Sequence, residues 1–140
     1  MDELKKAAIK QLKDNIPVWF ACPANKMWNR KEWILDTRNY NYQDILGMKW
    51  MDKKTQNTFY ELPSSHAMSI VGVHLVENKP VRWKVENSDG NDKGNSQFII
   101  MNDNYFEEKI TYVAIHKKYL TEKMLECLNQ EPIVTGIHEL

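Results

Sequence analysis

Two apolar stretches separated by a short polar turn constrain the fold of this chain more than any other feature. Residues 67–76 (AMSIVGVHLV) are almost wholly apolar and rich in β-branched side chains, which predicts a strand buried on both faces. Residues 77–80 (ENKP) form a turn by composition, and Pro80 is excluded from the middle of a ladder. Residues 81–86 (VRWKVE) then alternate, so their apolar side chains are expected on one buried face. The pattern predicts an antiparallel hairpin closed by a four-residue turn.

The two open ends of this hairpin each carry a polar side chain. His66 immediately precedes the first strand and Asn87 follows the second, so the hairpin makes them spatial neighbours. A cysteine or serine nucleophile needs such a pair, because the imidazole takes the proton and the amide oxygen accepts a hydrogen bond from the other ring nitrogen. The commoner interpretation is a hydrogen-bonded structural histidine beside a turn asparagine. Geometry alone leaves both interpretations open.

Three segments carry a resemblance to a known family: SSHAM at 64–68, KPVRWKVENSDG at 79–90 and MNDNYFEEKITYVAIHKKYL at 101–120. They resemble the C-terminal part of the papain-like cysteine aminopeptidases, the bleomycin hydrolase and aminopeptidase C family. The resemblance implies that His66 is the general base and that Asn87 orients it, with Ser65 in place of the family's threonine. It extends from Met1 to about Pro132.

The chain departs from the family pattern in two places that bear on chemistry. Asp89 replaces the tryptophan of the family's N-S-W-G segment, whose ring shields the histidine–asparagine pair from water, and an aspartate there favours the protonated imidazole. The C-terminal tail lacks the W-D-P-M-G segment of the family, so the carboxylate clamp on the substrate's α-amino group is not expected.

The nucleophile of a papain-like enzyme is also missing. Its cysteine precedes the histidine by about 130–150 residues in a C-G-[SA]-C-[WY] context, whereas only 65 residues precede His66 and the motif occurs nowhere in the chain. Cys22 and Cys127 are both interpreted as packing residues, because reactivity requires an electropositive, partly open setting. Pro23 prevents a helix from beginning at Cys22 and lowering the pKa of its thiol.

Composition fits one domain spanning residues 1–140 and excludes several function classes. The formal net charge is zero and the pI is about 6.9, which gives no electrostatic support for nucleic-acid or anionic-membrane binding. No apolar segment approaches the ~20 residues of a membrane span, and the N-terminus lacks the apolar core of a secretory signal. Two cysteines in unrelated contexts give no disulfide framework, which favours a reducing, cytoplasmic location.

The fold is expected to be α+β: a papain-like His/Asn lobe with a curved antiparallel sheet, an N-terminal helix and a short C-terminal helix. Helical spacing of Leu4, Ala8 and Leu12 predicts the first helix, with its lysines on the outer face and its end near Asp14. Further strands are predicted at 17–22, 98–101 and 110–116, with Tyr105 and Phe106 filling the core between the last two. Thr121 is expected to cap a final helix at 122–128.

Residues 23–50 are irregular and aromatic, and residues 51–63 show no decisive pattern. Lysines and arginines among the aromatic residues could suggest a single-stranded nucleic-acid surface, but acidic residues share the segment. Aromatic anchors that hold a long loop to the domain are the better interpretation. We expect no metal and no cofactor, since His66 and His74 lie too far apart along one strand to share an ion and His116 and His138 have no partner at ligand spacing.

Three functional hypotheses follow from these observations. In the first, the chain is a fragment or subunit of a cysteine aminopeptidase, supplies His66 and Asn87, and acts on peptide substrates once a cysteine-bearing lobe completes it. In the second, it is a non-catalytic pseudo-peptidase or binding module. In the third, Cys22 has been recruited as the nucleophile. A lone lobe would expose its interface, so we also expect self-association or a partner chain.

Overall fold

A computed structural model of the chain describes residues 1–24, 27–59, 61–88 and 98–131. The helices are α1 (Asp2–Lys13), α2 (Tyr42–Leu46), α3 (Lys53–Thr58), α4 (Asp103–Lys109) and α5 (Glu122–Leu128), with a 3₁₀ turn η1 at Lys117–Tyr119. The strands are β1 (Val18–Cys22), β2 (Trp28–Asn29), β3 (Ile34–Leu35), β4 (His66–Val76), β5 (Lys79–Glu86), β6 (Phe98–Asn102) and β7 (Tyr112–Ala114).

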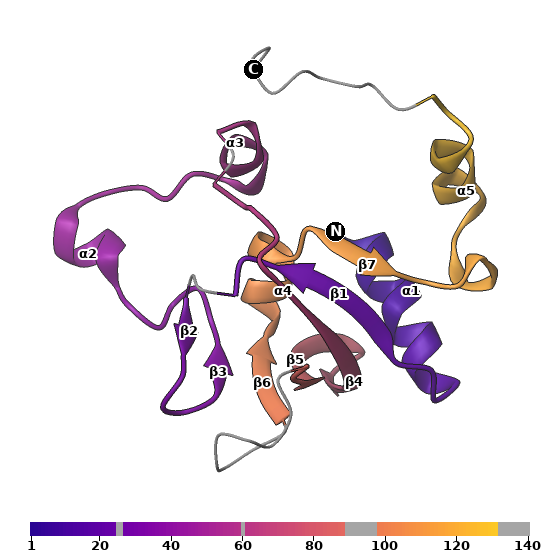
Figure 1. The fold of residues 1–140 in the computed structure, drawn as a ribbon, viewed down its shortest axis with the longest axis horizontal. Helices are drawn as coiled ribbons and strands as arrows, with labels where there is room; N and C mark the ends of the chain where they lie inside the picture. Colours follow the sequence, from indigo (N-terminus) through magenta and orange to yellow (C-terminus); the bar gives the residue numbers. More distant parts are fainter. Residues whose placement is uncertain (25–26, 60, 89–97, 132–140) are drawn as a thin grey trace.

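The strands form one curled sheet in the order β2-β3-β6-β5-β4-β1-β7 (Figure 1). Every neighbouring pair is antiparallel except β3 and β6, which run parallel. The long hairpin β4–β5 lies at the centre, α1 packs against β1 and β4, and α4 covers β5 and β6. The predicted α+β class, with a curved sheet, an N-terminal helix and a C-terminal helix, is confirmed.

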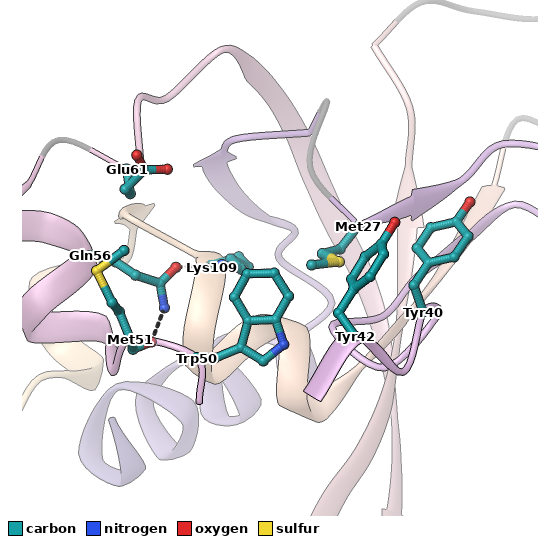
Figure 2. A pocket seen from close by; sticks show the side chains of 8 residues that line it. All are labelled: Met27, Tyr40, Tyr42, Trp50, Met51, Gln56, Glu61 and Lys109. Carbon is teal, nitrogen blue, oxygen red and sulfur yellow. Dashed lines mark hydrogen bonds between the residues drawn. The ribbon is translucent and has the colours of Figure 1, made fainter. Parts of the chain in front are cut away.

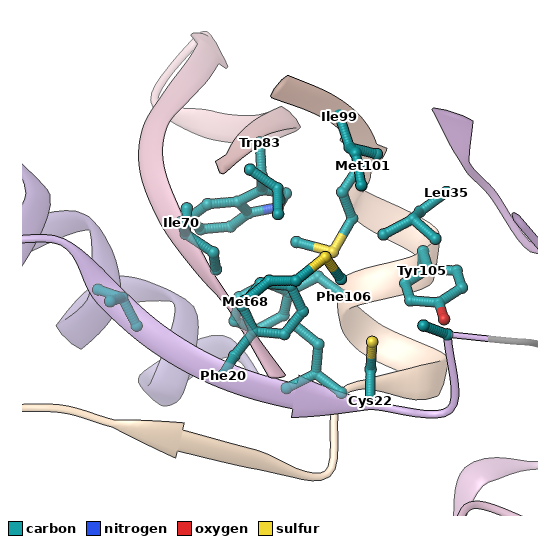
Figure 3. Close-up of a cluster of buried hydrophobic side chains, with 14 of the residues drawn as sticks. Phe20, Cys22, Leu35, Met68, Ile70, Trp83, Ile99, Met101, Tyr105 and Phe106 are labelled. Carbon is teal, nitrogen blue, oxygen red and sulfur yellow. The ribbon is translucent and has the colours of Figure 1, made fainter. Parts of the chain in front are cut away.

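The core lies between the central strands and α4, and Figure 3 shows its largest side chains. Trp83 on β5 is fully buried and stacks on Phe106 of α4, with ring centroids 4.6 Å apart. The indole nitrogen of Trp83 donates to Asp103 at 3.0 Å. Tyr105 and Phe106 fill the core as predicted, but they do so from a helix that the sequence pattern did not indicate.

The hairpin differs from its prediction at the turn. Glu77 and Asn78 both adopt the left-handed region, with φ of 50° and 62°, and Val76 pairs directly with Lys79. The connection is therefore a two-residue turn whose twist matches that of the strands, and not the four-residue turn predicted. The prediction underestimated how readily asparagine occupies the left-handed region.

Two register shifts interrupt the same hairpin. β4 carries one extra residue, Val71, between Ile70 and Gly72, and β5 carries one extra residue, Val81, between Pro80 and Arg82. The bulge exposes Val81, so the prediction that it shares the buried face of its strand is wrong. The prediction that β4 is buried on both faces is also wrong, because the turn half of this strand extends past the core and is half-buried or exposed.

The helix α1 ends where predicted, but its lysines are not all on the outer face. Lys5 is only 5% exposed and its ammonium group donates to Asp103 at 2.7 Å and to Glu107 at 3.0 Å. Burial opposes the charge on Lys5, but the two carboxylates outweigh this effect and raise its pKa. The buried face of α1 is therefore partly ionic.

The remaining segments confirm some predictions and shorten others. β1 occupies the predicted strand at 17–22, whereas β7 covers only Tyr112–Ala114 of the predicted 110–116. Thr121 caps α5, its hydroxyl oxygen accepting from the backbone N–H of Met124 at 3.4 Å. Among the described residues, no helix is both long and apolar enough to cross a membrane.

Residues 40–59, here called the arm, leave the body of the sheet and return to it (Figure 1). The arm contains α2 and α3, and α2 buries none of its residues. Ile45 is 75% exposed and Phe59 is 67% exposed. The aromatic-anchor interpretation therefore fails in the arm, and it holds only for Trp28 and Trp33, which precede the arm and pack against the core.

Candidate active site

The hairpin places its two candidate site residues in contact. His66 begins β4, and its ring nitrogen Nε2 lies 2.9 Å from the side-chain oxygen of Asn87, immediately after β5. Because an amide oxygen only accepts, Nε2 carries the hydrogen, and in the neutral ring Nδ1 is left as the acceptor. Asn87 is 7% exposed and His66 is half-buried, so the hydrogen bond is shielded from water. The predicted neighbourhood of these residues is confirmed, and their catalytic role stays a prediction.

The contact is diagonal across the hairpin. The last two ladder pairs are Ser69 with Glu86 and Ile70 with Val85, so one more pair in the same register would place Asn87 opposite Met68. Met68 lies two residues from His66, on the same face of β4. A diagonal neighbour at this spacing is within reach of long side chains, which explains why an imidazole and an amide can meet here.

The other neighbour of His66 in the sheet is Cys22, the last residue of β1. Cys22 has no exposed surface, and burial raises the pKa of its thiol to about 11. Figure 3 shows its sulfur directed into the core beside Tyr105. Cys22 is therefore a packing residue, as predicted, and its thiol is protonated at neutral pH.

Cys127, the second cysteine of the chain, lies exposed on α5 near the C-terminal end of the described residues. Neither cysteine combines partial exposure with a position facing the His66 imidazole. The sequence contains no other cysteine.

Trp28 is a site residue that sequence reasoning placed only as an anchor. Its indole lies against the His66 ring with centroids 6.2 Å apart and planes inclined by 32°. Trp28 belongs to β2, which three strands separate from β4 in sheet order, and it reaches His66 because the sheet curls. Only its place in an aromatic-rich segment just after β1 could have drawn attention to it.

Two expected features fall outside the described residues, namely Asp89 and the C-terminal tail from Pro132 onward. No group of three or more histidine, cysteine or acidic side chains gathers in a metal-binding cluster within the residues that the structure describes.

A separate hollow of about 410 Å³ lies between the arm and α4 (Figure 2). Tyr40, Tyr42 and Trp50 form an aromatic wall, and the Tyr42 and Trp50 rings meet edge to face at 6.1 Å. Gln56 closes the floor, where its amide accepts from Lys109 and donates to the Met51 carbonyl oxygen at 2.6 Å. Neither His66 nor Asn87 lines this hollow.

A family model and the sequences of known proteins point to the same family. The model of the Peptidase C1-like family matches residues 1–138. Aminopeptidase C of Listeria monocytogenes is 37% identical over 134 residues, which are 95% of this chain and 30% of the relative. Bleomycin hydrolase of Mus musculus is 36% identical over 139 residues, which are 96% of this chain and 30% of the relative.

Solved structures agree with the sequence comparison. The crystal structure of PepW from Lactobacillus rhamnosis HN001 superposes with a TM-score of 0.82 at 36% identity, covering 91% of this chain and 29% of that chain. This chain thus spans about 30% of the length of the curated relatives it matches. The match of the family model over nearly the whole chain, together with these relatives, shows that the chain belongs to the Peptidase C1-like family.

Proposed function

We propose that this chain supplies the general base, His66, and its orienting residue, Asn87, to a cysteine aminopeptidase whose nucleophile lies on another segment or chain. The hydrogen bond of 2.9 Å between His66 Nε2 and Asn87 Oδ1 carries this proposal. Relatives named aminopeptidase C and bleomycin hydrolase support it. Residues 1–140 would then form one domain, the C-terminal lobe of a two-lobed enzyme, and its substrates would be peptides cleaved at the N-terminal residue.

The hydrogen bond assigns a task to each ring nitrogen. With the Nε2 hydrogen donated to Asn87, the Nδ1 lone pair takes the proton of an incoming thiol, which gives a thiolate and an imidazolium. The thiolate attacks the peptide carbonyl carbon and forms a tetrahedral intermediate. As this intermediate collapses, the imidazolium returns its proton to the departing amine, leaving an acyl-thioester on the sulfur. Water deprotonated by His66 then hydrolyses the thioester and regenerates the thiol.

Asn87 serves both halves of this cycle. Its amide oxygen keeps the imidazole in one tautomer and stabilises the imidazolium when it forms, while an amide carries no charge that would hold the proton permanently. The low exposure of Asn87 strengthens this effect, because water competes poorly for a buried hydrogen bond.

A chimera tests the proposal directly. Residues 1–138 of this chain would replace the matching 30% of Listeria monocytogenes aminopeptidase C, which retains its own nucleophile. We expect the chimera to hydrolyse a fluorogenic aminoacyl amide, and we expect His66→Ala to lower kcat about 10²–10⁴-fold, the usual contribution of a general base. His74→Ala is the matched control, since His74 is an exposed histidine on the same strand. A folded chimera without activity, or activity indifferent to His66→Ala, would contradict the proposal.

A non-catalytic binding module is the second candidate. It is favoured by the burial of Cys22, because the chain on its own then offers a base without any thiol placed to use it. Under this alternative the chimera folds, binds a peptide substrate and does not cleave it. The hypothesis that Cys22 is a recruited nucleophile fails, because a fully buried thiol with a raised pKa cannot reach a substrate.

A further inference from the structure

The indole of Trp28 occupies one side of the His66 imidazole. Both rings are half-buried, their centroids are 6.2 Å apart and their planes are inclined by 32°. The side-chain oxygen of Asn87 accepts a hydrogen bond from Nε2 at the edge of the same imidazole. The ring is therefore restrained in two different ways, by a hydrogen bond at its edge and by an aromatic ring packed beside it.

Trp28 is itself held firmly in place. The Trp33 ring meets it edge to face at 6.2 Å, and the Arg30 guanidinium lies 4.4 Å from the centre of the indole. The preceding residue, Met27, has a left-handed φ of 60°, and its carbonyl oxygen accepts from the Asn39 amide at 2.9 Å. These contacts fix both the backbone and the side chain of Trp28 before any partner binds.

The indole nitrogen of Trp28 makes no hydrogen bond to the described residues. Its Nε1 is buried and finds no hydrogen-bond acceptor in the part of the chain that the structure describes. A buried donor without an acceptor costs free energy, and a phenylalanine would fill the same place without that cost. The contacts of Trp28 that the structure describes are packing contacts of its ring.

We propose that Trp28 is a positioning residue for His66, a role that rests on the proposed function for its catalytic meaning. The indole blocks rotation of the imidazole about its Cβ–Cγ bond and keeps water from that side of the ring. A half-turn about this bond would put a ring carbon where each nitrogen now lies, so it would break the contact with Asn87 and turn Nδ1 away from the thiol. Asn87 selects the tautomer, and Trp28 maintains the orientation in which that tautomer is useful.

The test uses nitrogen NMR of the isolated chain labelled with ¹⁵N-histidine, with the His66 signals assigned by their loss in His66→Gln. In the unmodified chain, at an alkaline pH where an imidazole is neutral, we expect two well-separated ring-nitrogen signals, one protonated and one not. In Trp28→Ala the two signals should move toward each other, because the other tautomer and ring orientation become populated. Trp28→Phe should restore the separation, since it keeps a flat ring. Trp50→Ala, which removes a tryptophan of the arm whose ring contacts Tyr42 and not His66, should change nothing.

The NMR signals of the variants support or overturn the positioning role of Trp28. Unchanged His66 signals in a folded Trp28→Ala chain would overturn it, as would failure of Trp28→Phe to restore them. Should Trp28→Ala not fold, Trp28→Leu keeps the apolar bulk without the flat ring and is expected to give a partial shift. In the active chimera, Trp28→Ala should lower kcat with little change in KM. The NMR result stands even if the chimera is inactive, so a failure of the positioning role and a failure of the proposed function are distinguishable.

Discussion

The body of the sheet and the arm contain similar apolar side chains, but the body buries them and the arm leaves them exposed. In the body, Trp83, Ile70 and Phe106 have no exposed surface and contact one another across β4, β5 and α4. In the arm, Trp50 and Ile45 remain open to solvent, and α2 buries none of its residues. Hydrophobicity alone therefore does not decide burial in this chain; the presence of a facing surface does.

The two regions also differ in what covers their apolar side chains. The body has a facing layer for every apolar strand at its centre, whereas the apolar side chains of the arm have none among the described residues apart from the hollow over α4. Large exposed apolar patches usually mark interaction surfaces. We propose that the exposed apolar side chains of the arm contact a second copy of the chain or a partner.

The largest expected effect compares two tryptophans. Trp83→Ala should destabilise the chain by about 3–5 kcal/mol, because it removes a buried ring, its stacking on Phe106 and its hydrogen bond to Asp103. Trp50→Ala should cost less than about 1 kcal/mol, because that ring is half exposed. Urea denaturation followed by circular dichroism measures both. Equal losses would show that the arm is as well packed as the body; Trp83→Phe gives an intermediate value should the alanine variant not fold.

The next effect concerns association through the arm. We propose that the isolated chain self-associates, and Ile45→Glu combined with Leu46→Glu should weaken that association by about tenfold or more, since two exposed apolar side chains of α2 would be lost from the contact. Sedimentation velocity over a range of concentrations measures it. Val76→Glu, at an exposed apolar position beside the hairpin turn, is the control. A monomeric unmodified chain, or an equal loss in the control, would contradict the role of the arm.

The smallest effect probes the junction of the arm with the body. Burial lowers the pKa of Lys53 to about 8, and its ammonium group donates to the carbonyl oxygens of Glu107 and Ile110. The unfolded chain keeps the ordinary lysine pKa of about 10.4 and so binds more protons than the folded chain between these values. Lys53 should therefore make the free energy of unfolding rise as the pH increases from about 8 to about 10.

Lys53→Met should remove this increment, whereas Lys54→Met should keep it, because Lys54 is exposed on the same helix. Thermal denaturation at a series of pH values measures the difference between the variants. Parallel pH profiles for the unmodified chain and Lys53→Met would show that Lys53 is hydrated in the folded state and that α3 is not seated against α4.

The body was predictable because its signals are local. The hairpin follows from an apolar run, a turn and an alternating run, and it brings His66 and Asn87 together whatever the rest of the chain does. The strand of Cys22 and the helix after Thr121 follow from equally local patterns. Local pattern also misled within the hairpin, because it cannot reveal a bulge, and Val81 is exposed for that reason.

The remaining features depend on contacts between distant segments. The burial of Lys5 requires the two carboxylates of α4, about a hundred positions later in the chain. The contact of Trp28 with His66 requires a left-handed residue at Met27 and the curl of the whole sheet. No periodicity encodes either arrangement, so sequence reasoning placed Lys5 outside and Trp28 in a loop.

The two bulges of the central hairpin determine which changes of length the chain can tolerate. Val71 and Val81 each add one residue to opposite strands, so the pairing at the turn and the pairing beside Asn87 stay in the same register. Deleting either residue alone would shift Asn87 against His66 by one position, about 3.3 Å, and turn it to the other face of the sheet. Deleting both would leave the contact intact. The number of residues between the base and its partner is thus set by strand pairing and can change only in matched steps.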